Sequence, residues 1–213
     1  HAHNDMYGCK VKFGVFWPMP ANISKHELDP FRSGDPVYFI RIANQVQDLV
    51  VGYIFGQIGR IDAARRWSVE AFTCLYNHLD VLPDEEAFML TLHQCTKNCC
   101  EKAKSDKNLR SEREIDDKLG TYISEILQAM DAHERLMAIL TYLFGSTQAN
   151  IARFTGMPLS MVQRRLKSAQ QKLPALFLEL PLSEIQRLRP SRDARFSDEV
   201  GKEITRLYNE NRM

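Results

Sequence analysis

The sequence predicts an all-α protein with two small helical domains joined by a linker, the second containing a helix-turn-helix. Apolar residues recur at steps of three and four through most of the 213-residue chain, which is the period of an amphipathic helix. No segment shows the strict alternation of apolar and polar residues that is typical of a half-buried β-strand. One short, densely charged stretch interrupts the helical pattern, and the chain length suits two small domains.

The N-terminal half is predicted to contain an irregular arm and a three-helix bundle. Glycine and proline recur through residues 1–36, which favours irregular structure there. Over 37–104, one helix follows Pro36, a second begins at Asp62 as its cap, and a third begins at Asp84 as its cap. Three such helices can bury one small core. The apolar positions expected to form that core are Ile40, Ala43, Val46, Val50, Ile54, Ile58, Trp67, Ala71, Cys74, Leu75, Phe88, Leu92, Cys95 and Cys99.

A charged linker is predicted over 105–118, because this stretch has too few apolar residues to contribute to a core. The second domain is then expected over 119–180, where helical periodicity returns. Residues 181–213 mix acidic and basic residues and are predicted to form an exposed, charged helical tail.

The second domain is expected to end in two helices around a tight turn. A short helix is predicted over 148–155 and a longer one over 160–173. Between them stands Gly156-Met157-Pro158, where glycine can adopt a left-handed conformation and proline can open the next helix. This spacing is typical of a helix-turn-helix.

The second helix of this motif has a basic face. From Ala149 to Leu178 there are five basic residues and no acidic ones, although the net charge of the whole chain is only +1. Arginine can make a forked contact to guanine and glutamine to adenine, while other basic residues hold phosphates. A solvated face of an ordinary bundle is the alternative interpretation. The predicted DNA-contacting residues are Ser160, Met161, Gln163, Arg164, Arg165, Lys167, Ser168 and Lys172.

Several of these residues occur in a recognisable order. The sequence contains, in this order, an Ile-Ala pair, a Gly-hydrophobic-Pro turn, a Val, an Arg-Leu pair and a closing Ala. This pattern resembles region four of bacterial RNA polymerase sigma factors, most closely the short extracytoplasmic-function type (sigma-70-like, group IV). Ser160 and Met161 depart from the family motif, so its base preference does not carry over. The matching residues are Ile151, Ala152, Gly156, Met157, Pro158, Val162, Arg165, Leu166 and Ala169.

The upstream helices are similar to region two of the same family. The stretch 51–80 resembles its first part, and 88–98 stands where the family has an aromatic-Leu pair and a helix closing on Asn. The resemblance implies that region two binds core RNA polymerase and captures the melted downstream strand, while region four reads the upstream element as duplex. By position, the candidates for contacting the melted strand are Lys97, Asn98, Lys102 and Lys104, and those for contacting polymerase are Asp62, Arg65, Arg66 and Glu70.

The polymerase-facing stretch departs from the family, because Arg65 and Arg66 stand where acidic residues are common. The resemblance implies core RNA polymerase and promoter DNA as partners, with an anti-sigma factor as a further one, and no membrane or small-molecule substrate. No enzyme, cofactor or metal is expected. Two alternatives stay open. One is a helix-turn-helix regulator whose N-terminal domain dimerises or binds an effector, and the other is a sigma-like decoy that binds a sigma regulator.

The five cysteines favour a reducing, cytoplasmic location. They are odd in number and lack paired spacing, which argues against a disulfide framework. A group comprising His93, Cys95, Cys99 and Cys100 raises a zinc or redox hypothesis. Structural zinc sites usually have close-spaced cysteine pairs, and buried free cysteine is common, so we expect no metal there. A thiol sensor would need a neighbour such as Lys97 to lower a thiol pKa.

Overall fold

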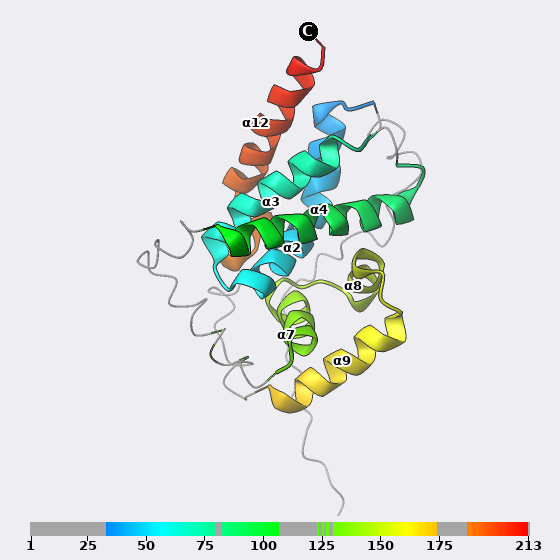
Figure 1. Ribbon diagram of the computed structural model, residues 1–213, viewed down its shortest axis with the longest axis vertical. Coiled ribbons are helices and arrows are strands. Elements are labelled where there is room, and N and C mark those ends of the chain that lie inside the picture. The colour runs from blue at the N-terminus through cyan, green and yellow to red at the C-terminus, as the bar shows by residue number, and fades with distance from the viewer. Residues whose placement is uncertain are drawn as a thin grey trace, which may run out of the picture.

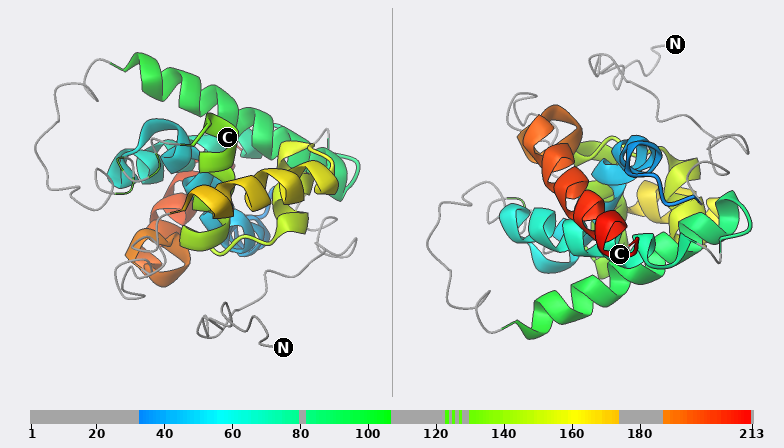
Figure 2. Two further views of the ribbon diagram at one scale, coloured as in Figure 1. Left: turned by 90° about the horizontal axis from the view of Figure 1, so that it is seen from below. Right: turned by 90° about the horizontal axis from the view of Figure 1, so that it is seen from above.

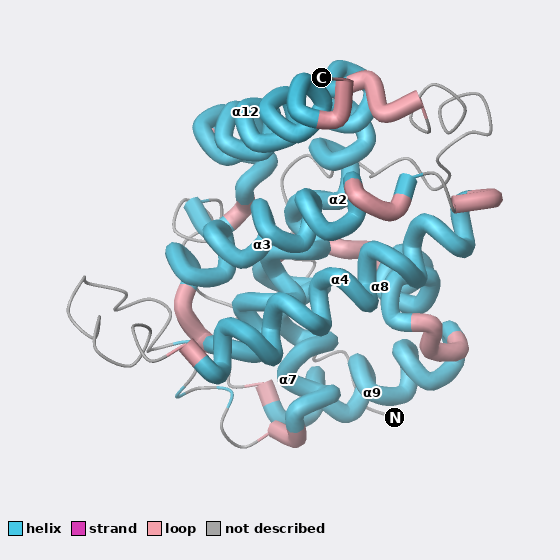
Figure 3. The backbone as a smooth tube through the Cα atoms, turned by 45° about the horizontal axis from the view of Figure 1, so that its top comes forward, coloured by secondary structure: helices cyan, strands magenta, loops and turns pink. Residues whose placement is uncertain are grey.

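The computed structural model describes residues 33–79, 82–106, 123, 125, 127, 130–173 and 187–212. Within these ranges every regular element is a helix, so the all-α prediction is confirmed (Figures 1 and 3). Most of the predicted arm and linker lies outside the described residues. The elements are α2 (Pro36–Ile58), α3 (Ile61–Tyr76), α4 (Glu85–Ser105), α7 (Ala132–Ala138), the π-helix η3 (Ile139–Leu143), α8 (Gln148–Thr155), α9 (Leu159–Lys172), the 3₁₀ helix η4 (Pro190–Arg192) and α12 (Ala194–Glu210).

The first three helices begin close to the predicted residues. Pro36 opens α2, and the Asp84 side chain caps α4 by accepting a 2.8 Å hydrogen bond from the backbone N–H of Ala87. The prediction that Asp62 caps the second helix is wrong, because α3 begins at Ile61 and places Asp62 inside its first turn. An acidic side chain there still interacts favourably with the positive end of the helix dipole.

The helices α2, α3 and α4 pack against one another, and α12 packs on α2 and α3 (Figure 2). The C-terminal segment is therefore not the exposed tail that the sequence predicts. One face of α12 buries Phe196, Val200 and Ile204, and the Phe196 ring meets the edge of Phe72 with the ring centroids 6.5 Å apart. Burying these side chains stabilises the α12 contact through the hydrophobic effect.

The helices of the predicted second domain share a buried core with the first three. Figure 1 shows α7, α8 and α9 grouped on the side of the bundle opposite α12. In this group α8 packs on α4, while η3 and α7 pack on α2. The rings of Tyr53 on α2, His93 on α4 and Phe154 on α8 meet edge to face at this junction, with centroids 5.0–5.5 Å apart. Burial and the nearby positive charge of Lys97 lower the pKa of His93.

Two glycines one turn apart allow α2 to approach η3 and α7 closely. A Cβ atom at Gly52 would lie 2.7 Å from a ring carbon of Phe144, and one at Gly56 would lie 2.9 Å from a methyl carbon of Leu136. Phe144 is itself buried, and its ring also lies 6.0 Å from that of Phe55. The missing side chains on α2 therefore make room for this part of the shared core.

We predict that Gly52→Ala destabilises the protein. The new methyl group would overlap the Phe144 ring, and overpacking of this kind typically costs about 1–3 kcal/mol, more than the roughly 0.5–1 kcal/mol that alanine gains in a helix. Urea unfolding followed by circular dichroism measures the change. Gly201→Ala on α12 is the control, because a Cβ there would meet the end of the Ile40 side chain at 3.1 Å, which can move. Equal stability of Gly52→Ala and the wild type would contradict the close approach.

Candidate nucleic-acid interface

The helices α8 and α9 flank a tight turn at the predicted position. The Thr147 hydroxyl caps α8 by accepting a hydrogen bond from Asn150. The helix ends at Thr155, and Gly156 after it caps the helix with a φ of 69°, in the left-handed region. Glycine adopts this conformation without steric penalty. The second helix, α9, begins at Leu159, one residue before the predicted start. Its inward side chains, Val162, Leu166 and Ala169, are buried.

The outward face of α9 is polar and basic. Ser160, Gln163, Arg164 and Lys167 are all exposed, and helical spacing places them on one face. Arg164 and Lys167 have no acidic partner among the described residues. The face therefore offers long side chains with free donors to solvent.

Three other predicted contact residues lie on a flank of α9 and bind the start of α7. Arg165 pairs with Asp131 at 3.0 Å, while Ser168 donates to Glu134 and Lys172 pairs with Glu134, each at 2.5 Å. Both acids belong to a capping box, in which Asp131 accepts from the backbone of Glu134 and Glu134 accepts from the backbone of Asp131. The structure thus divides the predicted set between a free face and a paired flank. The eighth predicted residue, Met161, is half-buried.

Glu134 is the central group of this flank, with only 4% of its surface exposed. Hydrogen bonds from Lys172 and Ser168, and one from the backbone of Asp131, lower the pKa of Glu134 to about 2. Its carboxylate is therefore ionised at neutral pH and offsets basic charge on the paired flank. An Asp-x-x-Glu signature before an apolar run could have indicated this capping box from the sequence.

We predict that Glu134→Gln lowers the free energy of unfolding at neutral pH. The amide keeps a hydrogen-bond acceptor but loses the charge that binds Lys172. The charge contributes fully above the ordinary glutamate pKa of 4.5, and its contribution is lost as the pH falls towards about 2. Urea unfolding of both proteins between pH 7 and pH 3 should show a difference that shrinks with acidification. Glu101→Gln, at an exposed position of α4, is the control, and a pH-independent difference would contradict the assignment.

The four candidates for the melted strand are exposed on α4 in two pairs. Lys97 and Lys104 lie on one side, where the Lys104 ammonium donates to the Gln57 side chain at 2.9 Å. Asn98 and Lys102 lie on another side, along a groove between α3 and α4. The four candidates therefore lie towards two edges of the exposed face of α4, with the acidic Glu101 between them.

The polymerase candidates lie on α3, and one of them is held by the C-terminal segment. Asp62, Arg66 and Glu70 are exposed. Arg65 donates to the Asp193 carboxylate at 3.0 Å and to the carbonyl of Arg187 at 2.9 Å. The segment before α12 therefore covers part of the predicted polymerase-facing surface.

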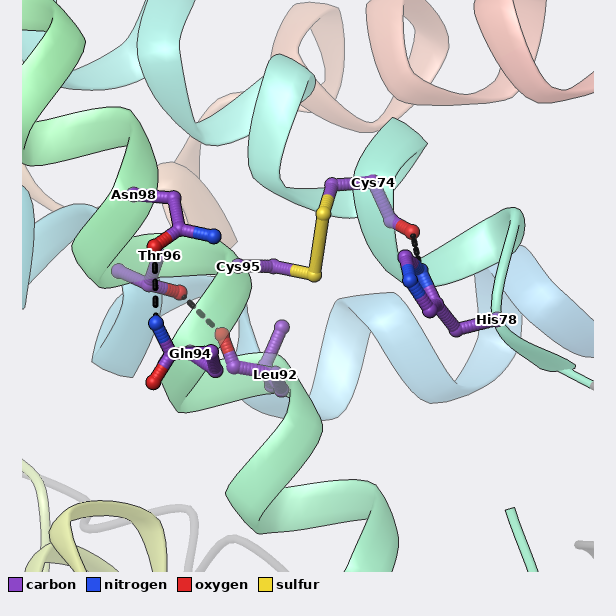
Figure 4. The surroundings of a disulfide bond; sticks show 7 residues. All are labelled: Cys74, His78, Leu92, Gln94, Cys95, Thr96 and Asn98. Atoms are coloured by element: carbon purple, nitrogen blue, oxygen red, sulfur yellow. Dashed lines mark hydrogen bonds between the residues drawn. A yellow bond between two sulfur atoms is a disulfide. The ribbon is translucent and has the colours of Figure 1, made fainter. Parts of the chain in front are cut away.

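The expectation of no disulfide is wrong, because Cys74 on α3 is bonded to Cys95 on α4 (Figure 4). The two residues are 21 positions apart on neighbouring helices, with Cα atoms 5.8 Å apart, so local spacing does not reveal the pair. Cys99 and Cys100 are free and buried, and burial raises their pKa values to about 11 and 12. Their thiols stay protonated at neutral pH, which contradicts a lowered thiol pKa at these two positions.

The predicted group of His93 and three cysteines is not assembled around one point. The His93 ring lies against Tyr53, with Nε2 3.3 Å from the phenol oxygen, in the junction with α8. The histidine beside the Cys74–Cys95 bond is instead His78, which was not among the residues predicted from the sequence (Figure 4). Its spacing of four residues from Cys74 was the available signal.

Comparison with known proteins finds no matching protein-family model and no matching curated protein. Among the described residues, no helix is long and apolar enough to cross a membrane. The site itself combines a buried apolar back on α9, a paired flank and a free basic face. Such a helix can enter a groove of duplex DNA with its free face while the rest of the fold fixes its orientation.

Proposed function

We propose that this protein is a sigma-like transcription initiation factor, which binds core RNA polymerase and directs it to specific promoters. The observation that carries the proposal is the free face of α9, where Gln163, Arg164 and Lys167 are exposed on a helix that follows a tight turn. The residues in and around that turn also carry the resemblance to sigma region four.

Each exposed side chain has a distinct role in the proposal. Arg164 can make a forked contact to guanine, and Gln163 can pair with adenine in the major groove. Lys167 contacts a phosphate and sets the register of the helix. Because α9 is packed on α7 and α8, its orientation is set before it meets the DNA, which reduces the entropy lost on binding.

The polymerase contact is proposed on α3, at Asp62, Arg66 and Glu70, with Arg65 available once the C-terminal segment releases it. The melted downstream strand is proposed to bind α4, through Lys97 and Lys104 on one side or Asn98 and Lys102 on the other. The protein would then act in the cytoplasm without a cofactor or catalytic step, and an anti-sigma factor would be a natural regulator.

A second candidate is a helix-turn-helix regulator whose N-terminal bundle dimerises or binds an effector. The shared core favours it, because α8 packs on α4 and η3 packs on α2. A regulator requires only that α9 reach the DNA, whereas an initiation factor must also contact polymerase and a second promoter element. The sigma-like decoy requires neither the contact of α9 with duplex DNA nor the contact with a second promoter element.

Run-off transcription with purified core RNA polymerase, on a fragmented genomic library from the source of the protein, tests the main proposal. We expect transcripts that depend on the protein and share an upstream sequence. DNA retardation without such transcripts would identify the regulator. Absence of both would leave the decoy.

For duplex binding we predict that Arg164→Ala weakens affinity by about 1–3 kcal/mol and relaxes sequence preference, because a forked base contact is lost. Lys167→Ala should instead weaken binding to all sequences similarly and reduce the salt dependence by about one phosphate contact. Fluorescence anisotropy on duplexes selected by the wild type measures both.

The control for these variants is Lys202→Ala, which removes one positive charge from an exposed position of α12. It should bind the selected duplexes as the wild type does, since α12 and α9 lie on opposite sides of the bundle (Figure 1). Equal loss of binding in all three variants would mean that only net charge matters, which would contradict the role given to α9.

A further inference from the structure

Three side chains of types that commonly bind metals lie close together beside the groove between α3 and α4. The sulfur atoms of Cys74 and Cys95 and a ring nitrogen of His78 all lie within 4.8 Å of one another. Cys74 and His78 come from the C-terminal end of α3 and the turn after it, and Cys95 comes from the middle of α4. Of the described residues, this is the one group of three or more histidine, cysteine or acidic side chains so placed.

The His78 ring is oriented by a hydrogen bond. Its Nδ1 lies 2.7 Å from the carbonyl oxygen of Cys74 (Figure 4). A carbonyl oxygen only accepts, so Nδ1 carries the proton and Nε2 keeps its lone pair. Metal-binding histidines characteristically donate their other ring N–H to a carbonyl or carboxylate in this way.

The three side chains open onto a groove of about 520 Å³. The groove lets an ion and its water reach the sulfur atoms from solvent, because His78 is exposed at its edge.

We propose that Cys74, His78 and Cys95 form a binding site for a soft divalent cation such as Zn²⁺ when the Cys74–Cys95 disulfide is reduced. Two thiolates and one imidazole are donors that Zn²⁺ prefers, and a water molecule from the groove completes four ligands. None of the three ligands is a proposed DNA or polymerase contact, although Glu70, Asn98 and Lys102 line the same groove. Binding of the cation does not depend on those contacts.

The disulfide and the metal-bound state exclude each other. Reduction transfers two electrons and two protons from a dithiol to the disulfide, which gives two thiols and a cyclic disulfide of the reductant. Binding of Zn²⁺ then displaces the two thiol protons. In the reverse direction hydrogen peroxide takes two electrons from the two thiolates and, with two protons, forms two water molecules. The sulfur–sulfur bond is restored and the cation is released.

Both states join α3 to α4, so the site would keep these helices together under reducing and oxidising conditions alike. A disulfide alone would lose that link in a reducing environment. The metal would replace it there with a second cross-link between the same two cysteines.

Cobalt titration of the full chain tests this proposal. The protein is reduced with dithiothreitol, freed of it without oxygen, and titrated with Co²⁺. We expect one Co²⁺ per chain, thiolate-to-cobalt absorption in the near ultraviolet, visible bands of a tetrahedral ion, and displacement of Co²⁺ by Zn²⁺. The same protein oxidised with hydrogen peroxide should bind no Co²⁺ in this manner.

Matched variants assign the ligands. Cys95→Ser and His78→Ala should each weaken Co²⁺ binding by at least about tenfold, whereas Cys100→Ser, at a buried free cysteine outside the cluster, should bind as the wild type does. His78 is exposed, so His78→Ala should keep the helical circular dichroism of the wild type. Absence of thiolate–cobalt absorption in the reduced protein, or wild-type affinity in folded His78→Ala, would overturn the proposal.

Discussion

The close approach of α2 to η3 at Gly52 is the constraint on which the arrangement of the interface depends. The Phe144 ring occupies the space that a side chain on α2 would fill, and Leu136 of α7 lies in the same way over Gly56. The start of α7 carries Asp131 and Glu134, which pair with side chains of α9. The basic helix α9 thus packs on a helix, α7, that is itself seated on α2 where α2 lacks two side chains.

Charge on α9 is distributed by this packing. Asp131 is an exposed partner for Arg165, and a pair of that kind contributes only about 0.2–1 kcal/mol. Glu134 differs because it is buried and holds both Ser168 and Lys172. These carboxylates offset the positive charge on the flank of α9. The unpaired positive charge of the helix is therefore concentrated on its outward face. Affinity for a polyanion and a fixed orientation are therefore provided by different residues of one helix.

The sequence predicted the helices well because their signals are local: apolar periodicity, the Asp84 cap, and the glycine at Gly156 all act within a few residues. The long-range contacts were harder to predict. Gly52 and Gly56 carry no hydrophobic signal, yet they seat the second group of helices on the first. Cys74 and Cys95 meet across two helices, and neither their number nor their spacing indicates a pair. The apolar stripe of α12 is short within a highly charged segment, which hid its burial.

The shared core bears directly on how an initiation factor of this kind could work. An upstream duplex element and a melted downstream strand lie apart on a promoter, whereas α8 and α9 are seated here on α4 and α2. Separating the two groups would expose Phe144, Phe154 and Leu140, all buried, at about 1.5–3 kcal/mol for each side chain. Binding to polymerase would have to supply several kcal/mol to open the protein. A DNA-binding regulator needs no such opening. A stable junction between the two groups of helices therefore favours the regulator over the initiation factor.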